Sequence, residues 1–169
     1  MMGGDLNLNL NPEITFRYLT PNDKQMLFEW RNTPEIVLLS TSQKQVSQEE
    51  HSAWFDTIQN SDYTKVFIIE EFNFPIGQVR FDRQDDGCQI SIYLLPGHTG
   101  KGRGSELILT AIKNLSQVWK DIKWIDAHIR SENIQSIKAF EKAGFRNINH
   151  MLTLPAALEI KIMRFEIIV

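Results

Sequence analysis

The N-terminal part of the chain reads as one strand followed by short helices. Residues 14–19 alternate between apolar and polar positions, which predicts a first strand. Thr20-Pro21 then supplies a cap and a proline for the first helical position, and this helix should end near residues 31–32. Thr33-Pro34 repeats the signal, so we predict a second, short helix ending near residue 40.

A third helix and three strands follow. Ser47 opens a capping box, and apolar positions then recur at helical spacing, which predicts a helix over residues 48–59. Three β-rich runs come next, with turn signals at residues 73–75 and 85–87 between them. They form a predicted antiparallel meander over residues 66–71, 76–82 and 88–95.

The C-terminal half alternates between helices and strands. After a glycine-rich segment, one face of a long helix is apolar, formed by Leu107, Ile108, Ala111, Ile112, Leu115, Val118 and Trp119. We then predict a strand at residues 121–129, a helix at 133–143 stopped by Gly144, and strands at 145–152 and 159–168. The pattern therefore indicates an α+β fold with a central sheet.

Composition narrows the class of protein. The 169 residues suit one domain, and 42% hydrophobic residues are enough for a core. A net charge of -3 argues against a nucleic-acid partner, and no apolar stretch is long enough for a membrane span. The single cysteine, Cys88, excludes an internal disulfide. With no secretory signal in residues 1–11, we expect a cytoplasmic protein that binds no metal.

The candidate chemistry lies in the segment from Ile90 to Leu107, where a strand enters a loop with four glycines that opens a helix. Glycines allow close approach of the backbone to a ligand, and the helix N-terminus favours an anion. Lys101 and Arg103 add positive charge. The pattern therefore indicates a phosphate site, although a plain tight turn has the same glycines. It matches neither the GxxxxGK[ST] motif nor a Rossmann unit.

Two segments resemble the signatures of the GNAT acetyltransferase superfamily. Residues 99–104 resemble the acetyl-CoA signature Q/R-x-x-G-x-G/A, and residues 133–145 resemble N-x-x-[AS] followed by a helix that ends in Gly-Phe. The resemblance covers the chain from about residue 14 to its end. It implies a single GNAT domain over residues 13–169, with a mixed central sheet of about six to seven strands flanked by helices. Residues 1–12 would form a flexible arm.

The resemblance implies acetyl-CoA as the cofactor and assigns residues to it. The strand end at Leu94 and Leu95 should bind the pantetheine arm through its backbone, and Asn133 should lie near the thioester. Ser136 and Phe140 belong to the same second signature and to the implied coenzyme site. The pyrophosphate should be held by the backbone amides of Lys101, Gly102, Arg103, Gly104 and Ser105.

Two residues depart from the family pattern. Thr99 stands where the family has Gln or Arg, so one side-chain contact is lost from the loop. Phe140 stands where many members have the tyrosine that protonates the leaving thiolate, and phenylalanine has no proton to donate.

Several other side chains are candidates for the missing acid or base. The catalytic candidates are His51, Tyr93 and Arg80, and Glu70 and Asp82 carry further titratable groups. Each has a structural alternative: a packed histidine, a core aromatic, and a surface ion pair between Arg80 and Asp82, which share a strand face.

A further resemblance concerns the acceptor. Residues 28–35, 50–55 and 77–82 are similar to a GNAT subgroup that acetylates the 4-amino group of UDP-linked amino sugars in pseudaminic or legionaminic acid biosynthesis. This implies a small-molecule amine acceptor, a nucleotide sugar, and leaves a homodimer open. The substrate-binding residues would be Trp30, Arg31, Asn32, Trp54 and Asp82. Alternatives are a ribosomal-protein-type N-terminal acetyltransferase and a non-catalytic acetyl-CoA-binding module.

Overall fold

A computed structural model describes residues 14–40, 42–154 and 158–167. The predicted arm at residues 1–12 lies outside the described residues. The elements run in the order β1 (Ile14–Tyr18), η1 (Pro21–Asp23), α1 (Lys24–Arg31), α2 (Pro34–Leu39), α3 (Gln48–Ile58), β2 (Thr64–Glu71), β3 (Phe74–Gln84), β4 (Gly87–Leu94), α4 (Gly104–Val118), β5 (Trp124–Arg130), α5 (Ile134–Lys142), β6 (Arg146–Leu154) and β7 (Leu158–Glu166).

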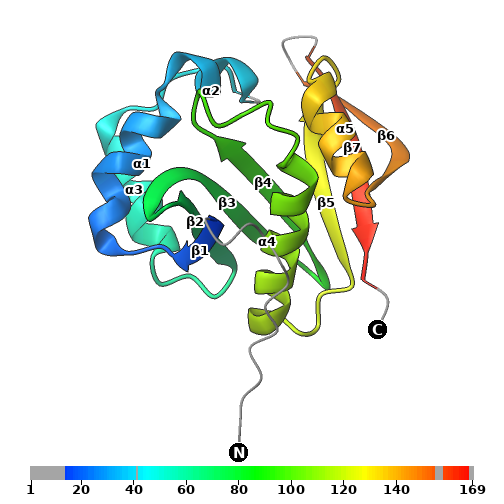
Figure 1. Cartoon of the computed structure of the whole chain (residues 1–169), viewed down its shortest axis with the longest axis horizontal. Coiled ribbons are helices and arrows are strands. Elements are labelled where there is room, and N and C mark those ends of the chain that lie inside the picture. The colour runs from blue at the N-terminus through cyan, green and yellow to red at the C-terminus, as the bar shows by residue number, and fades with distance from the viewer. Residues whose placement is uncertain (1–13, 41, 155–157, 168–169) are drawn as a thin grey trace, which may run out of the picture.

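The strands form one mixed seven-stranded sheet in the order β1-β2-β3-β4-β5-β7-β6 (Figure 1). Every neighbouring pair is antiparallel except β4 and β5, which are parallel. Helix α4 makes the crossover that this parallel pair requires. The predicted α+β class, the mixed sheet and the strand number are confirmed.

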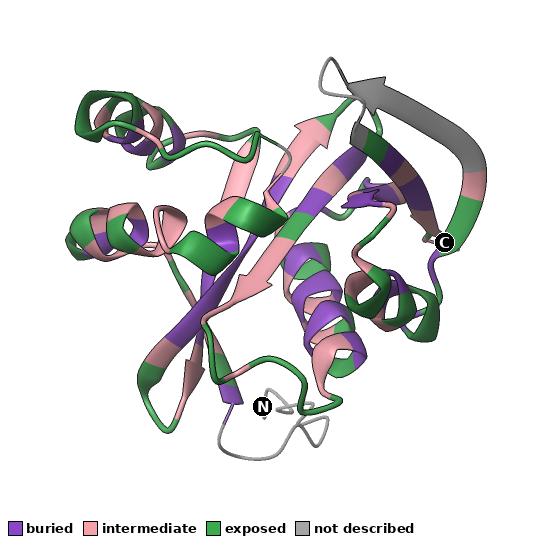
Figure 2. Cartoon of the chain, turned by 90° about the horizontal axis from the view of Figure 1, so that it is seen from above, coloured by how far each residue is buried: buried purple, intermediate pink, exposed green. Residues whose placement is uncertain are grey.

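The two faces of the sheet are covered by different helices (Figure 2). Helices α4 and α5 cover one face through a core that includes Phe81, Ile125 and Phe140. On the other face, α1 and α3 pack Leu27 and Phe55 against Ile68 of β2. The central strands continue beyond that smaller cluster with polar side chains, so one part of this face is available for a site.

Several strand boundaries differ from the prediction, two of them for clear local reasons. The turn between β2 and β3 is made by Phe72 and Asn73, with φ angles of 50° and 65°, and Phe74 already begins β3. The left-handed backbone of both residues suits a tight hairpin, and its hand matches the twist of the strands. Strand β5 begins at Trp124 rather than at residue 121, because Asp121 still belongs to the turn after α4.

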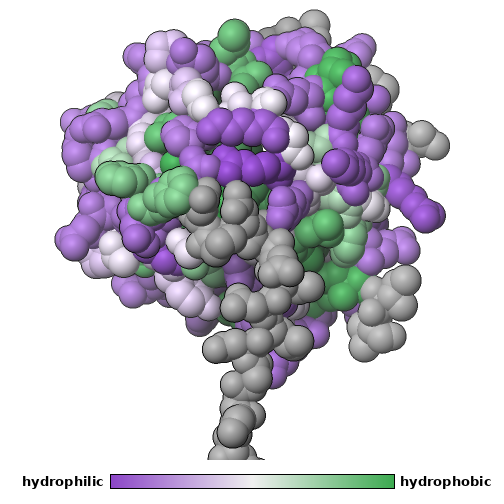
Figure 3. Space-filling model, in the orientation of Figure 1, coloured by the Kyte–Doolittle hydropathy of each residue, from purple (hydrophilic) through white to green (hydrophobic). Residues whose placement is uncertain are grey.

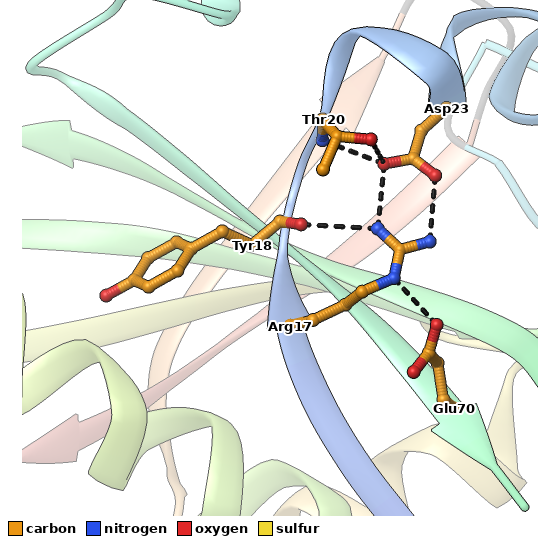
Figure 4. Close-up of polar contacts among 5 residues, drawn as sticks. All are labelled: Arg17, Tyr18, Thr20, Asp23 and Glu70. Carbon is orange, nitrogen blue, oxygen red and sulfur yellow. Dashed lines mark hydrogen bonds and ion pairs between the residues drawn. The ribbon is translucent and has the colours of Figure 1, made fainter. Parts of the chain in front are cut away.

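Arg17 fastens the first helical segment to the sheet (Figure 4). Its guanidinium donates to both carboxylate oxygens of Asp23, at 2.8 Å each, and to Glu70 Oε1 at 2.6 Å. Burial opposes ionisation of Asp23, but hydrogen bonds from Arg17 and Thr20 hold the pKa of this carboxyl below its usual value. The segment that begins α1 is therefore fixed by a charged network as well as by apolar packing.

The sheet opens between β4 and β5. Their pairing begins at Gly87 and Trp124 and ends at Ile90 and Ala127, although β4 continues to Leu94 and β5 to Arg130 (Figure 1). Beyond Ile90 the two strands leave backbone groups without a strand partner on this side. The opening lies directly before the glycine-rich loop, where the pantetheine arm was predicted.

Gly77 keeps β3 close to this opening. The pairing of β2 with β3 shifts register between Ile69 and Glu70, which places a bulge just before Gly77. A Cβ at Gly77 would lie 2.4 Å from the Tyr93 carbonyl oxygen, so only glycine fits there without displacing β4. The position of Tyr93 and Leu94 therefore depends on the absence of a side chain on the neighbouring strand.

No helix in the described part of the chain is long and apolar enough to cross a membrane. The face shown in Figure 3 is mostly hydrophilic, with apolar side chains in small groups.

Candidate active site

The glycine-rich loop between β4 and α4 is shaped by left-handed backbone. Gly97, Gly100 and Gly102 have φ angles of 85°, 73° and 72°, which other residues adopt only with strain. A Cβ at Gly102 would meet no heavy atom within 4 Å. The loop therefore curves sharply while its surface at Gly102 stays open to a ligand.

Helix α4 begins at the end of this loop with free amide groups. Its N-cap residue, Arg103, makes no side-chain capping bond, so within the described residues the first-turn amides are left for a ligand. A Cβ at Gly104 would lie 3.0 Å from Ala139 Cβ, so this glycine lets α4 pack closely on α5. Amides and helix dipole together make an anion site.

Arg103 adds a cation that is only partly neutralised. One guanidinium nitrogen, Nη1, donates to Glu71 Oε1 at 2.6 Å, and His98 Nδ1 lies 3.2 Å from Glu71 Oε2. The hydrogen bond from Arg103 lowers the pKa of Glu71. Nε and Nη2 of Arg103 are buried without a partner among the described residues. Two unused donors beside open amides fit the pyrophosphate of acetyl-CoA.

The second predicted signature lies beside the loop. Asn133 caps α5, because its side-chain oxygen accepts a hydrogen bond from the Ser136 backbone N–H at 3.1 Å. A Cβ at Gly100 would lie 3.9 Å from Gln135 Nε2, so the loop and the first turn of α5 are neighbours. The contact of Asn133 with the thioester stays a prediction.

Phe140 is a core residue in this structure, in contrast to the predicted coenzyme contact. Its ring packs edge-to-face on Phe145 at 4.8 Å between centroids, and the residue is only 3% exposed. Its part in the site is indirect, since it packs α5 against the sheet.

On the opposite face of the sheet, α1, α3, β3 and β4 bring most of the predicted acceptor residues together. Trp30 meets Tyr93 edge-to-face at 6.4 Å between centroids, and the Arg80 guanidinium lies 5.9 Å from the Trp54 ring centroid. Arg80 Nε also donates to Asp82 Oδ2 at 2.8 Å. Arg31 is close enough to Tyr93 and Arg80 to influence both electrostatically. We call Trp30, Arg31, Trp54, Arg80, Asp82 and Tyr93 the acceptor cluster.

The acceptor cluster is electropositive. Arg80 is paired with Asp82, but Arg31 Nη1 is buried without a partner in the described part of the chain. Burial and the charge of Arg80 lower the pKa of Arg31. An anionic group on a ligand would offset both effects.

Tyr93 is protonated at neutral pH. Burial raises the pKa of its hydroxyl well above the ordinary value, and the neighbouring Arg31 and Arg80 only partly oppose this. The hydroxyl can therefore donate a proton but cannot serve as a base at physiological pH.

The structure places His51 inside an aromatic cluster. Its ring lies 5.4 Å from Phe28, 5.2 Å from Trp54 and 6.2 Å from Phe55 between centroids, and the residue is 4% exposed. Neither ring nitrogen has a hydrogen-bond partner among the described residues. This position favours a packing role over the predicted base.

Asn32 holds a segment of backbone rather than projecting as a free side chain. Its amide nitrogen donates to the Val46 carbonyl at 3.0 Å, and its oxygen accepts from the Val46 N–H at 2.8 Å. Arg31 Nη2 donates to Ser42 Oγ at 2.9 Å, and Arg130 donates to the Leu38 carbonyl. Arg31 and Asn32 therefore clamp the connection between α2 and α3, and Arg130 holds the end of α2.

The sequence reasoning missed Gln78. It occupies the same face of β3 as Arg80 and Asp82, pairs with Tyr93 on β4, and is 7% exposed. The alternation that placed Arg80 and Asp82 on one face would also have included Gln78, two residues earlier.

The described residues contain no group of three or more His, Cys, Asp or Glu side chains placed to hold a metal ion. The candidate site thus has two parts: a glycine-rich loop with the donors of an anion site, and the acceptor cluster with its two guanidinium groups.

Residues 13–146 match the Acetyltransferase (GNAT) domain family. The chain belongs to this family. This family supports acetyl-CoA as the coenzyme and acetyl-CoA-dependent N-acetyl transfer as the reaction class, as the two signatures predicted.

Individual relatives are distant. An uncharacterized protein of Methanocaldococcus jannaschii is 31% identical over 144 residues, which are 79% of this chain but only 28% of that protein. The acetyltransferase PseH of Campylobacter jejuni is 21% identical over 131 residues, covering 77% of this chain and 81% of PseH.

Solved GNAT structures share the fold. Spermidine N-acetyltransferase of Vibrio cholerae, in complex with CoA and spermine, superposes with a TM-score of 0.80 at 20% identity, covering 92% of this chain and 96% of that one. An aminoglycoside acetyltransferase in complex with coenzyme A and kanamycin gives 0.76 at 21% identity, covering 90% and 94%.

Within this GNAT enzyme, Gly102→Asp should weaken acetyl-CoA binding about tenfold or more, because it sets a carboxylate against the pyrophosphate site. Gly97→Asp is the matched control, since Gly97 has a similar φ angle and equally open surroundings but lies before the predicted amides. Calorimetric titration with acetyl-CoA measures both. Equal losses, or none, would contradict the placement of the pyrophosphate.

His51 should make the stability of the enzyme depend on pH. Burial, and to a smaller extent Lys24, lowers the pKa of His51. Below about pH 6.5 the unfolded chain therefore binds a proton here that the folded chain does not, so stability falls with falling pH.

His51→Phe should reduce this slope between about pH 6.5 and 5 by up to ~1.4 kcal/mol per pH unit. Urea unfolding at several pH values measures it. His128, whose pKa burial also lowers, stays in both proteins as a common background. Parallel stability curves would show that His51 titrates alike in both states.

Proposed function

We propose that this enzyme transfers the acetyl group to the 4-amino group of a UDP-linked amino sugar. The observation that carries the proposal is the charge of the acceptor cluster. It contains two guanidinium groups and one carboxylate, and that carboxylate is already paired with Arg80. A nucleotide sugar brings the diphosphate that such a cluster would bind.

The charge also separates this acceptor from the amines named for the structural neighbours. Spermine and kanamycin are polycations, and a site for them needs carboxylates that are not already paired. The described acceptor cluster offers none, whereas Arg31 Nη1 has no hydrogen-bond partner among the described residues. The relationship to PseH, at 21% identity, supports the same substrate class.

The aromatic members of the cluster suit the rest of the ligand. Trp30 and Trp54 are half-buried, so each keeps part of its ring accessible beside an arginine. Such faces can stack on uracil or pack against a deoxysugar methyl group. Asp82, next to Arg80, offers an acceptor for a sugar hydroxyl.

The proposal also assigns the proton that the leaving thiolate needs. Acetyl-CoA supplies an activated thioester. Phe140 has no proton to give, whereas Tyr93 lies on β4 close to the opening and holds its proton at neutral pH. We assign Tyr93 as the donor that replaces the tyrosine usual in the family.

A thiol-release assay with acetyl-CoA and a panel of UDP-amino sugars, peptide N-termini, polyamines and aminoglycosides tests the acceptor. UDP-linked 4-amino sugars should give the highest kcat/KM. Release with peptide N-termini and not with any UDP-amino sugar would favour the protein N-terminal alternative.

Arg31→Gln should raise the KM for the UDP-amino sugar about 10- to 100-fold, because one charge-assisted hydrogen bond to the diphosphate is lost. The KM for acetyl-CoA should not change. Arg83→Gln is the control, since Arg83 lies on the other face of β3, over Trp119 and paired with Asp121. Similar effects of the two variants would argue against diphosphate binding at Arg31.

Tyr93→Phe should lower kcat about 100-fold or more while leaving both KM values nearly unchanged, as expected for loss of a proton donor. In the wild-type enzyme the rate should show no falling limb below about pH 10, because burial raises the pKa of Tyr93. Tyr18→Phe, at an exposed tyrosine on β1, is the control. A Tyr93→Phe enzyme with normal kcat would place the proton donor elsewhere.

A further inference from the structure

Gln78 lies where the apolar cluster under α1 meets the acceptor cluster. Its Cα partners are Ile68 on β2 and Tyr93 on β4. Ile68 is fully buried with Leu27 and Phe55, and Tyr93 is in contact with Trp30. Gln78 is therefore a buried polar residue between the two clusters, two positions after the bulge at Ile76.

The side-chain oxygen of Gln78 makes no hydrogen bond within the described part of the protein. Oε1 is buried and has no hydrogen-bond partner among the described residues. Asp23 and Asp126, two other buried polar residues of the same face, are tied to Arg17 and Arg164. Packing alone would favour an apolar side chain between Ile68 and Tyr93. A buried acceptor without a partner, inside a binding site, points to a donor on the ligand.

The chemistry of a carboxamide oxygen limits what that donor is. The oxygen accepts hydrogen bonds and is not basic, so it neither protonates nor deprotonates its partner. The acceptor amine must be neutral with its lone pair directed at the thioester, which leaves its N–H bonds to be held from another side. The guanidinium groups of Arg31 and Arg80 cannot do this, because they are donors only.

We propose that Gln78 Oε1 accepts a hydrogen bond from the acceptor amine and orients its lone pair toward the thioester. This inference rests on the proposed placement of the acceptor over the acceptor cluster, and it holds for any amine bound there. Gln78 would act by positioning, while Arg31 holds the distant anionic part of the same ligand.

Gln78→Met keeps the length of the side chain and removes the acceptor oxygen. It should lower kcat/KM for the amine about 10- to 100-fold, as expected for one hydrogen bond made to the reacting group. The KM for acetyl-CoA and the slow hydrolysis of acetyl-CoA without an amine should stay as in wild type. The midpoint of urea unfolding should stay equal or rise, because a buried polar atom without a partner is gone. Gln84→Met, exposed at the end of β3, is the control.

Gln78→Glu supplies a second, independent measurement. It keeps an acceptor oxygen and adds a negative charge beside the amine, so the rising limb of the pH–rate profile should move to higher pH. The pH–rate profile of Gln78→Glu therefore tests the role of Gln78 even if Gln78→Met does not fold.

The wild-type acceptor panel separates the two proposals. If the enzyme uses a different amine, the UDP-amino sugar assignment fails, and the Gln78 variants are then assayed with the amine that it does use. A Gln78→Met enzyme within twofold of wild type for that amine, or a Gln78→Glu profile that does not move, overturns the role of Gln78.

Discussion

The separation of β4 from β5 is the constraint on which the rest of the site depends. These strands form the sheet's one parallel pair, and they share only the register from Gly87 to Ile90. A parallel pair needs a long crossover, which here contains both the glycine-rich loop and α4. The strands part after Ile90, β4 continues to Leu94 with an edge not paired to β5, and the loop follows directly. On its other edge β4 pairs with β3, where Gly77 leaves the room that the Tyr93 carbonyl oxygen needs.

The glycine-rich loop and the acceptor cluster draw their positive charge from different sources. At the glycine-rich loop, positive charge comes from backbone amides, the dipole of α4 and an Arg103 that Glu71 partly neutralises. In the acceptor cluster it comes from side chains, with Arg31 and Arg80 close to Tyr93, whose pKa burial raises. The fold fixes the position of the backbone amides. The positions of the charged side chains depend on packing, and Trp30 and Trp54 contribute to it through their contacts with Tyr93 and Arg80.

Most of the fold could be predicted from the sequence, because its signals are local. The capping box at Ser47 and Glu50 forms as expected, with bonds of 2.8 and 3.1 Å, and the long apolar face of α4 is buried. The glycine-rich loop could be recognised because glycine has few other reasons to recur so closely. A packed histidine was a structural alternative for His51, and Trp54 and Phe55 follow it on the same helix, but the third ring, Phe28, comes from α1 and only the fold brings it close. The hydrogen bonds between the Asn32 amide and Val46 likewise depend on the fold. The alternation on β3 places Gln78 on the face of Arg80 and Asp82, but its burial can be known only once the neighbouring strands are placed.

The connection between α2 and α3 is held by side-chain hydrogen bonds, whereas the sheet is held by strand pairing. Arg31 and Asn32 bind Ser42 and Val46 within that connection, and Arg130, the last residue of β5, binds the Leu38 carbonyl at the end of α2. The conformation of the connection therefore depends on a few side-chain hydrogen bonds. None of its described residues belongs to a strand, so exchanges there do not alter the strand pairings directly. For protein engineering, this connection is the natural place to graft recognition of a new amine onto an otherwise unchanged acetyl-transfer scaffold.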